Sequence, residues 1–167
     1  LSSSIDMAIL TTPTNNNSLF EIPLYHEKFI AYMSPDCKYR EKELKANDMP
    51  EENLWVLQEG QCIIKGQKFK FCTSDIANNI YAAGSIDTLV RIVDENGGYT
   101  VIPELHRKFL SEEQQKNIRE IVSPVTKREI SLVIRQDYIK ERMLNSVANT
   151  IKQIIPQDMI DDRLKKF

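Results

Sequence analysis

Two cysteines are the residues of this sequence whose type and spacing most directly suggest chemistry. Cys62 and Cys72 lie ten positions apart in the stretch EGQCIIKGQKFKFC (59–72), with three lysines between them. Positive charge near a thiol favours the reactive thiolate. A disulfide between them would close a short loop worth about 3 kcal/mol of chain entropy, which suits a reversible switch better than a permanent cross-link.

The same cysteines also allow a simpler interpretation. Free cysteine is commonly a small buried apolar residue, and spacing alone favours that role. Against it, Cys62 follows Gly60 at a point where a strand gives way to a loop, and such positions often carry function in α/β sheets. The third cysteine, Cys37, lies in a charged loop and is interpreted as incidental.

Other chemistries find little support in the sequence. The two histidines, His26 and His106, lie far from each other and from the cysteines, and the C-x₂-C spacing of zinc motifs is absent. No metal site is therefore predicted. Neither a G-x-S-x-G motif nor a glycine-rich phosphate or dinucleotide loop is present, and no cofactor is expected. Acidic pairs such as Asp161-Asp162 are interpreted as solvated surface.

Composition indicates a soluble globular protein. The chain has 167 residues, 41% of them hydrophobic and 28% charged, enough for one core or two small lobes. A net charge of −2 argues against a nucleic-acid-binding surface within this segment. The sequence has no signal-peptide pattern and no long apolar run, and its sparse cysteines fit a reducing cytoplasm. Because it starts without Met in what resembles a core strand, we expect a fragment of a longer protein.

Alternating strands and helices must position the cysteines. Apolar runs predict strands at 5–10, 19–24, 26–35, 54–58, 69–72, 99–103 and 129–135. Helices are expected from the Ser85 cap to Asn96, over most of 104–118, and from an Asp137 cap to Ile154, with a possible short helix at 49–53. This alternation predicts an α/β fold with a largely parallel sheet.

Three segments carry a resemblance to a known family. They are LWVLQEGQC followed by FC, GSIDTLVRIVDENGGYTVIP (84–103) and REISLVIR (128–135). The sequence resembles the regulatory domain of LysR-type transcriptional regulators over almost its whole length. Its cysteine pair is similar to that of the hydrogen-peroxide-sensing members of this family.

The resemblance implies a fold like a type II periplasmic binding protein, with two α/β lobes joined by crossing strands. Residues 25–124 would form the second lobe, and residues 1–24 and 125–167 would form part of the first. The remainder of the first lobe and a winged helix-turn-helix DNA-binding domain would precede this segment.

The resemblance also implies a mechanism. Cys62 matches the peroxide-reactive cysteine, which peroxide converts to a sulfenic acid, and Cys72 matches the resolving cysteine. Gly60, Gln61 and Arg128 would support the peroxide site, with the fixed charge of Arg128 stabilising the thiolate. The reversible disulfide would change contacts within a homodimer or tetramer, and thereby binding to DNA and to RNA polymerase.

Two positions depart from the family pattern. Gln61 replaces a frequent histidine, so it can orient peroxide through hydrogen bonds but cannot transfer a proton. Lys65 replaces an acidic residue, and the cysteine spacing is one residue longer than usual.

Two further hypotheses remain. A LysR-type effector domain could bind a small organic ligand in the interlobe cleft, with incidental cysteines. A thiol peroxidase is the enzymatic alternative, but the sequence has no C-x-x-C motif to support it. We expect a regulator rather than an enzyme.

Overall fold

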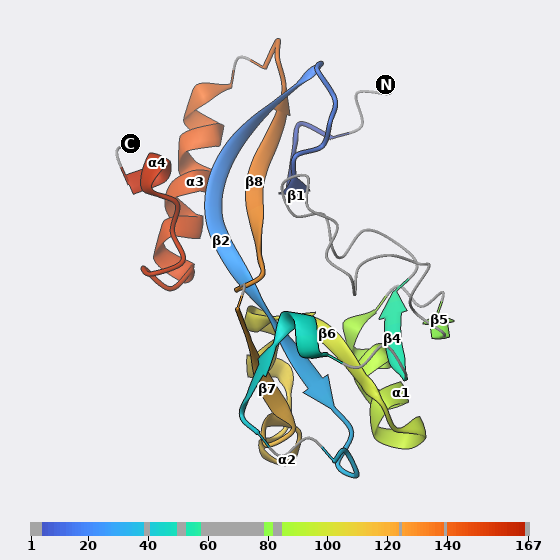
Figure 1. Ribbon diagram of the computed structural model, residues 1–167. Coiled ribbons are helices and arrows are strands. Elements are labelled where there is room, and N and C mark those ends of the chain that lie inside the picture. The colour runs from blue at the N-terminus through green and yellow to red at the C-terminus, as the bar shows by residue number, and fades with distance from the viewer. Residues whose placement is uncertain are drawn as a thin grey trace. The chain divides into compact units, whose positions relative to one another are not determined.

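The computed structural model describes residues 5–38, 41–49, 53–57, 79–81, 85–123, 125–138 and 140–165. It divides into two compact units, each with its own core (Figure 1). Unit 1 comprises Leu1–Glu27 and Arg128–Phe167, and unit 2 comprises Lys28–Lys127. The assignment of these units to the two lobes of the family remains a prediction. No helix among the described residues is long and apolar enough to cross a membrane.

Three strands build the sheet of unit 1. β1 (Met7–Thr12) pairs antiparallel with β8 (Lys127–Arg135), and Met7 stands opposite Ile134. On its other side β8 neighbours the first half of β2 (Leu19–Met33). The two strands expected at 19–24 and 26–35 are thus one continuous strand, because Pro23 and Tyr25 both adopt extended backbone.

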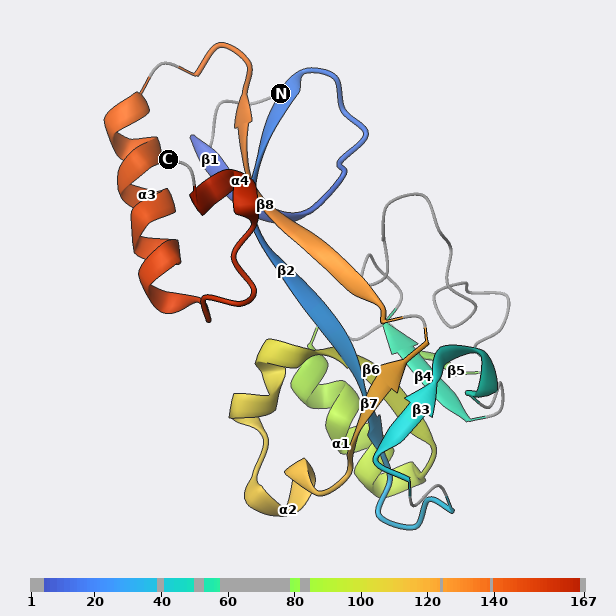
Figure 2. The ribbon, with the colours of Figure 1, turned by 60° about the vertical axis from the view of Figure 1, so that its left-hand side comes forward.

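Helix α3 (Glu141–Ile154) lies along this sheet (Figures 1 and 2). Its apolar face joins a core built around Leu24, Leu132, Ala148 and Ile160. The helix that the sequence predicts here is confirmed, but its expected cap is wrong. It begins at Glu141, whereas Asp137 bonds Arg135 instead.

The sheet of unit 2 is mixed rather than largely parallel. The second half of β2 pairs antiparallel with β6 (Tyr99–Pro103) and with β7 (Ile118–Val122). The remaining pairs are parallel: β3 (Glu43–Lys45) with β7, and β4 (Leu54–Leu57) with both β6 and β5 (Asn79–Tyr81). A helical crossover between β5 and β6 produces the parallel arrangement around β4.

Helix α1 (Ile86–Asn96) forms this crossover and packs against β4 and β6 (Figure 2). It begins after Ser85, as predicted, although the Ser85 side chain makes no cap bond. It ends at two glycines with positive φ, 78° at Gly97 and 84° at Gly98. A Cβ on Gly98 would stand 2.3 Å from the carbonyl oxygen of Asn53, so only glycine fits this approach.

The segment 104–118 is less helical than predicted. It contains a 3₁₀ helix (Glu104–Phe109) and one short helix, α2 (Glu112–Gln115), before β7 begins at Ile118. Ser111 caps α2 as expected, in a capping box with Gln114. A 3₁₀ turn lies at Ala46–Asp48, and most of the short helix expected at 49–53 lies outside the described residues.

Candidate functional site

The cysteine pair and its immediate neighbours lie outside the described residues. This applies to Gly60, Gln61, Cys62 and Cys72, and to the strand expected at 69–72. Of the predicted site residues, the structure describes Arg128, at the start of β8.

Arg128 is paired with a buried carboxylate. Its Nε donates a hydrogen bond to Oε2 of Glu27 at 2.8 Å, and its Nη2 lies 2.7 Å from the same oxygen. The Glu27 side chain is 2% exposed and that of Arg128 is 19% exposed. A charge removed from water in this way is tolerated only with an opposite charge and hydrogen bonds. Arg128 is therefore a partly buried, ion-paired residue of unit 1 rather than a surface charge at a strand end.

The charges of this pair influence the pKa of Tyr25. It lies two residues before Glu27 on β2, so both side chains emerge on the same face of the strand. Burial raises the pKa of Tyr25, the negative charge of Glu27 raises it further, and the positive charge of Arg128 lowers it. The field of the ion pair thus extends to neighbouring groups.

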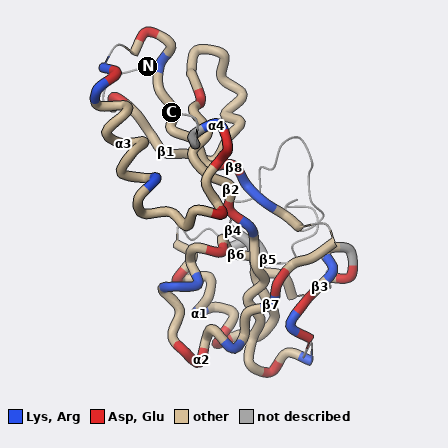
Figure 3. Tube along the Cα trace, turned by 90° about the vertical axis from the view of Figure 1, so that its left-hand side faces the viewer, with Lys and Arg blue, Asp and Glu red and all other residues tan. Residues whose placement is uncertain are grey.

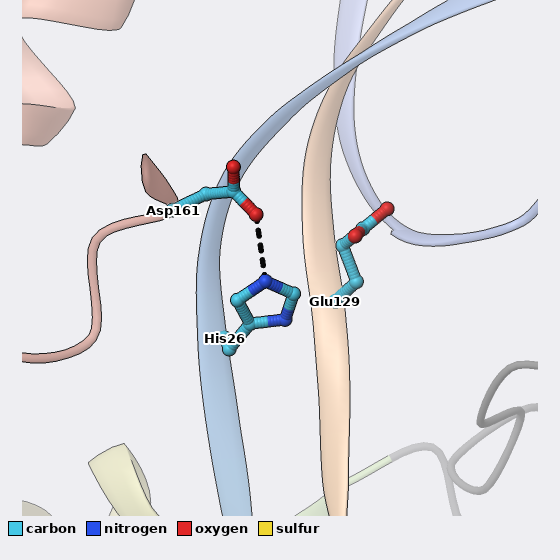
Figure 4. Close-up of side chains that lie close together, drawn as sticks. All are labelled: His26, Glu129 and Asp161. Atoms are coloured by element: carbon cyan, nitrogen blue, oxygen red, sulfur yellow. Dashed lines mark hydrogen bonds and ion pairs between the residues drawn. The ribbon is translucent and has the colours of Figure 1, made fainter. Parts of the chain in front are cut away.

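A second cluster of charged side chains includes the adjacent residues of the same two strands (Figure 4). His26 on β2, Glu129 on β8 and Asp161, just before helix α4 (Asp162–Lys165), bring ligand-type atoms within 4.8 Å of one another. The Nε2 of His26 lies 2.6 Å from Oδ2 of Asp161. Imidazole and carboxylates of this kind can bind a divalent transition metal.

Arg163 already provides the cation for this cluster. Its Nε donates to Oδ1 of Asp161 at 2.8 Å, and its Nη2 donates to Oδ2 of Asp161 at 2.9 Å and to Oε2 of Glu129 at 2.6 Å. The hydrogen bonds from Arg163 hold the pKa of Asp161 well below its usual range, against the opposing effect of burial. A metal ion would have to displace this guanidinium, so the cluster is better explained as a structural clamp.

The clamp fastens the C-terminal segment to β2. The backbone N–H of His26 donates to the Met159 carbonyl at 2.8 Å, and that of Asp161 donates to the Leu24 carbonyl at 3.0 Å. Tyr25 and Ile160 form an antiparallel bridge between these bonds. The side-chain cluster therefore reinforces a short piece of strand pairing.

The sequence interpretation missed this clamp. Asp161 was expected on a solvated face, but it is 5% exposed and accepts several hydrogen bonds. The apolar residues Met159 and Ile160 immediately before it are the one local signal that this segment packs against the protein.

Unit 2 contains an open pocket with a volume of about 550 Å³. Its lining mixes acidic and basic side chains with two apolar ones: Lys38, Glu41, Glu43, Leu44, Lys45, Asp48 and Val122. Five of these seven side chains are charged, whereas sites for small organic ligands are usually lined mainly by hydrophobic and aromatic side chains. Figure 3 shows the same mixture of charges over the described chain, where basic and acidic residues are interspersed in each unit.

Cys37 is partly buried against the core of unit 2, where its thiol lies 3.5 Å from the sulfur of Met33. The interpretation of Cys37 as incidental to the chemistry stays a prediction.

Comparison with known proteins agrees with this architecture. The LysR substrate binding domain family matches residues 1–153 of the chain. The hydrogen peroxide-inducible genes activator of Haemophilus influenzae is 29% identical over 162 residues, which cover 90% of this chain and 52% of that protein. A probable hydrogen peroxide-inducible genes activator of Mycobacterium leprae is 23% identical over 158 residues, covering 91% and 50%. The chain thus spans about half the length of these curated relatives.

Solved structures show the same fold. The crystal structure of OxyR from Porphyromonas gingivalis matches with a TM-score of 0.79 and 28% identity, covering 94% of this chain and 73% of that one. The reduced OxyR of the same organism matches with a TM-score of 0.78 and 28% identity, covering 96% and 74%. The fold is therefore that of a periplasmic-binding-protein-like α/β regulatory domain, as predicted.

Proposed function

Because the chain belongs to the LysR substrate binding domain family, we propose that it is the redox-sensing regulatory part of a peroxide-responsive transcription activator. The observation that carries the proposal is the agreement of two comparisons. The curated relatives described above are named as peroxide-inducible activators, and the structural neighbours described above are OxyR proteins.

The proposed chemistry uses the two cysteines in sequence. The Cys62 thiolate attacks one oxygen of hydrogen peroxide, the O–O bond breaks, and the departing hydroxide takes a proton to leave as water. Cys62 is then a sulfenic acid. The Cys72 thiolate attacks the sulfur of Cys62, the S–O bond breaks as the disulfide forms, and the departing hydroxide takes a proton to leave as a second water. Two thiols are oxidised, one peroxide is reduced, and a cellular dithiol reductant reverses the bond.

Three further residues would support the first step. Arg128 supplies a permanent positive charge, which stabilises a thiolate at neutral pH. Its pairing with the Glu27 carboxylate holds the guanidinium in one place, and the negative charge of Glu27 offsets part of its field. Gly60 would permit a close approach of backbone and peroxide, and Gln61 would orient peroxide by hydrogen bonds.

The proposed output is a change in assembly rather than a product. In this proposal the disulfide alters contacts in a homodimer or tetramer in the cytoplasm, and DNA is bound by a separate domain of the full-length protein. RNA polymerase would be the next partner, and the protein would not act as an enzyme.

The test is stoichiometric hydrogen peroxide added to the protein, followed by peptide mapping. We expect rapid formation of a Cys62–Cys72 disulfide, with Cys37 remaining a free thiol. A Cys62→Ser variant should abolish the bond, whereas a Cys37→Ser variant should leave it unchanged. A Cys62 that reacts no faster than an ordinary free cysteine would refute the proposal.

The family description favours one alternative, an effector domain that binds a small organic ligand. This alternative expects saturable binding of a ligand that changes DNA affinity equally in the wild type and in the Cys62→Ser variant. The peroxide sensor expects the DNA response to disappear with Cys62.

A further inference from the structure

Asn96 and Gly97 form an Asn-Gly sequence at the end of helix α1, which takes no part in the chemistry proposed above. An Asn-Gly sequence can modify itself. Once the glycine N–H has given its proton to a base, the backbone nitrogen can attack Cγ of the asparagine side chain. Glycine permits this attack because it has no Cβ to obstruct the approach.

The reaction replaces an amide group by a carboxyl group. As the Gly97 nitrogen bonds to Cγ of Asn96, the bond from Cγ to Nδ2 breaks, and the departing nitrogen takes a proton to leave as ammonia. A five-membered succinimide ring results. Water then adds to one of the two ring carbonyls and opens the ring. The product is either aspartate or isoaspartate, in which the backbone runs through the side chain and is one methylene longer.

The fold restrains both reacting groups. The Gly97 N–H donates to the Val93 carbonyl at 3.0 Å, so its proton is held in a hydrogen bond. The Asn96 side chain is exposed, and its Nδ2 donates to the Ile92 carbonyl at 3.1 Å, one turn back along the helix. This bond keeps Cγ directed toward the preceding turn and away from the Gly97 nitrogen. Both bonds must therefore open before the ring can form.

Residues outside α1 keep this helix end closed, although helix ends usually fray. The indole Nε1 of Trp55, on β4, donates to the Gly97 carbonyl at 2.9 Å. The Ser34 N–H donates to the Gly98 carbonyl, also at 2.9 Å. Trp55 itself packs against the core cluster of unit 2 that contains Val90. The exposed amide is thus kept unreactive by hydrogen bonds to the body of unit 2 rather than by burial.

We propose that Asn96 is a deamidation site whose reactivity is controlled by the hydrogen bond from Trp55 to the Gly97 carbonyl. The rate of deamidation follows the population of the form in which the end of α1 is open. Isoaspartate would lengthen the chain just before the turn and displace Gly98 from its close approach to the Asn53 carbonyl, so the opening would become permanent. This site is independent of the function proposed above.

The measurement is the fraction of deamidated Asn96 in protein incubated at pH 8, determined over time by peptide mapping and mass spectrometry. Trp55→Phe keeps an aromatic ring on β4 and removes the donor. Loss of one hydrogen bond worth about 1 kcal/mol raises the population of the open form, so we expect deamidation about fivefold faster than in the wild type. Asn96→Gln should remain unmodified over the same period, because its longer side chain must close a six-membered ring.

The matched control is Glu120→Gln, which removes the charged partner of Arg107 elsewhere in unit 2 and should leave the deamidation rate unchanged. Circular dichroism would establish that each variant is folded. A further comparison needs no substitution: the wild type unfolded in urea should deamidate at least about tenfold faster than the folded wild type.

Two results would overturn the inference. A folded Trp55→Phe that keeps the wild-type rate, or that reacts no faster than Glu120→Gln, would show that Trp55 does not control the site. Equal rates in the unfolded and the folded wild type would show that the fold does not protect Asn96.

Discussion

Adjacent residues on the same two strands build two different charged clusters in unit 1. Glu27 and Arg128 form a buried pair, whereas His26 and Glu129 belong to the clamp around Asp161 and Arg163. Successive strand residues point to opposite faces, so each strand contributes one residue to each cluster. The side chains of Glu27 and Arg128 are 2% and 19% exposed, while the Arg163 side chain of the clamp is 56% exposed.

This difference in exposure indicates different roles. A buried pair gains little stability over apolar residues of similar volume, but removing one partner is costly because it leaves the other charge uncompensated. The clamp instead joins the C-terminal segment to β2 through several hydrogen bonds, and its cation, Arg163, is the exposed member whose charge solvent screens. The Glu27–Arg128 pair joins β2 to β8, whereas the clamp holds the C-terminal segment against β2.

The largest expected effect comes from separating the buried pair. Glu27→Leu should lower the free energy of unfolding by about 3–5 kcal/mol, because the Arg128 charge loses its carboxylate partner. The double variant Glu27→Leu/Arg128→Met should recover most of this loss. Urea unfolding gives the free energy of unfolding of both variants. A double variant that is as unstable as Glu27→Leu alone would contradict the prediction.

A smaller effect is expected from breaking the clamp. Asp161→Ala removes the acceptor of hydrogen bonds from Arg163 and His26, and should cost about 1–3 kcal/mol. The loss should be local. Amide hydrogen exchange should therefore accelerate at His26, whose N–H bonds the Met159 carbonyl, and remain unchanged at Tyr99 in unit 2. Equal acceleration in both units would show that the clamp is not local.

The clamp should also respond to acid in one direction. The pKa of Asp161 is lower in the folded protein than in the unfolded chain. As the pH falls, the unfolded chain therefore binds a proton at Asp161 before the folded protein does. Its contribution is fully present well above the unfolded pKa of about 3.9 and declines as the pH drops below that value. The stability difference between wild type and Asp161→Asn should thus shrink between pH 6 and pH 3. A difference that stays constant over this range would mean that Asp161 has an ordinary pKa.

The smallest effect is expected at the exposed pair of Arg135 with Asp137. These side chains are 47% and 68% exposed and lie two residues apart on the surface. Asp137→Asn should leave the unfolding midpoint within experimental error, since exposed ion pairs contribute little. A measurable drop in the unfolding midpoint would show that an exposed ion pair can also stabilise the fold. Burial would then not explain the difference between the two clusters.

Local patterns in the sequence were reliable where a single element decided the structure. Helix α1 was predicted from its Ser85 start, its apolar spacing and its final glycines, all of which lie within one continuous segment. The apolar runs of β6 and β8 were likewise sufficient. Asp137 failed as a cap because Arg135, only two residues away, offered its side chain a stronger partner than the helix start.

Family resemblance added what local patterns could not provide, since it identified the regulatory-domain fold and drew attention to Arg128. It gave no indication of Glu27, which lies 101 positions away in the sequence. An acidic residue within an apolar run resembles an ordinary outward-facing strand position, and nothing near it in the sequence reveals a buried partner.

The sequence by itself determined β1, β4, β6 and β8, both halves of β2, helices α1 and α3, and the spacing of the two cysteines, because these depend on neighbouring residues. Only the tertiary structure decided which charges meet. Antiparallel β1 and β8, and the neighbouring strand β2, bring residues more than a hundred positions apart into contact. Those contacts decide whether a carboxylate is solvated, clamped or buried. Removing a carboxylate from water costs free energy, and the partner that offsets this cost reaches it only in the folded chain.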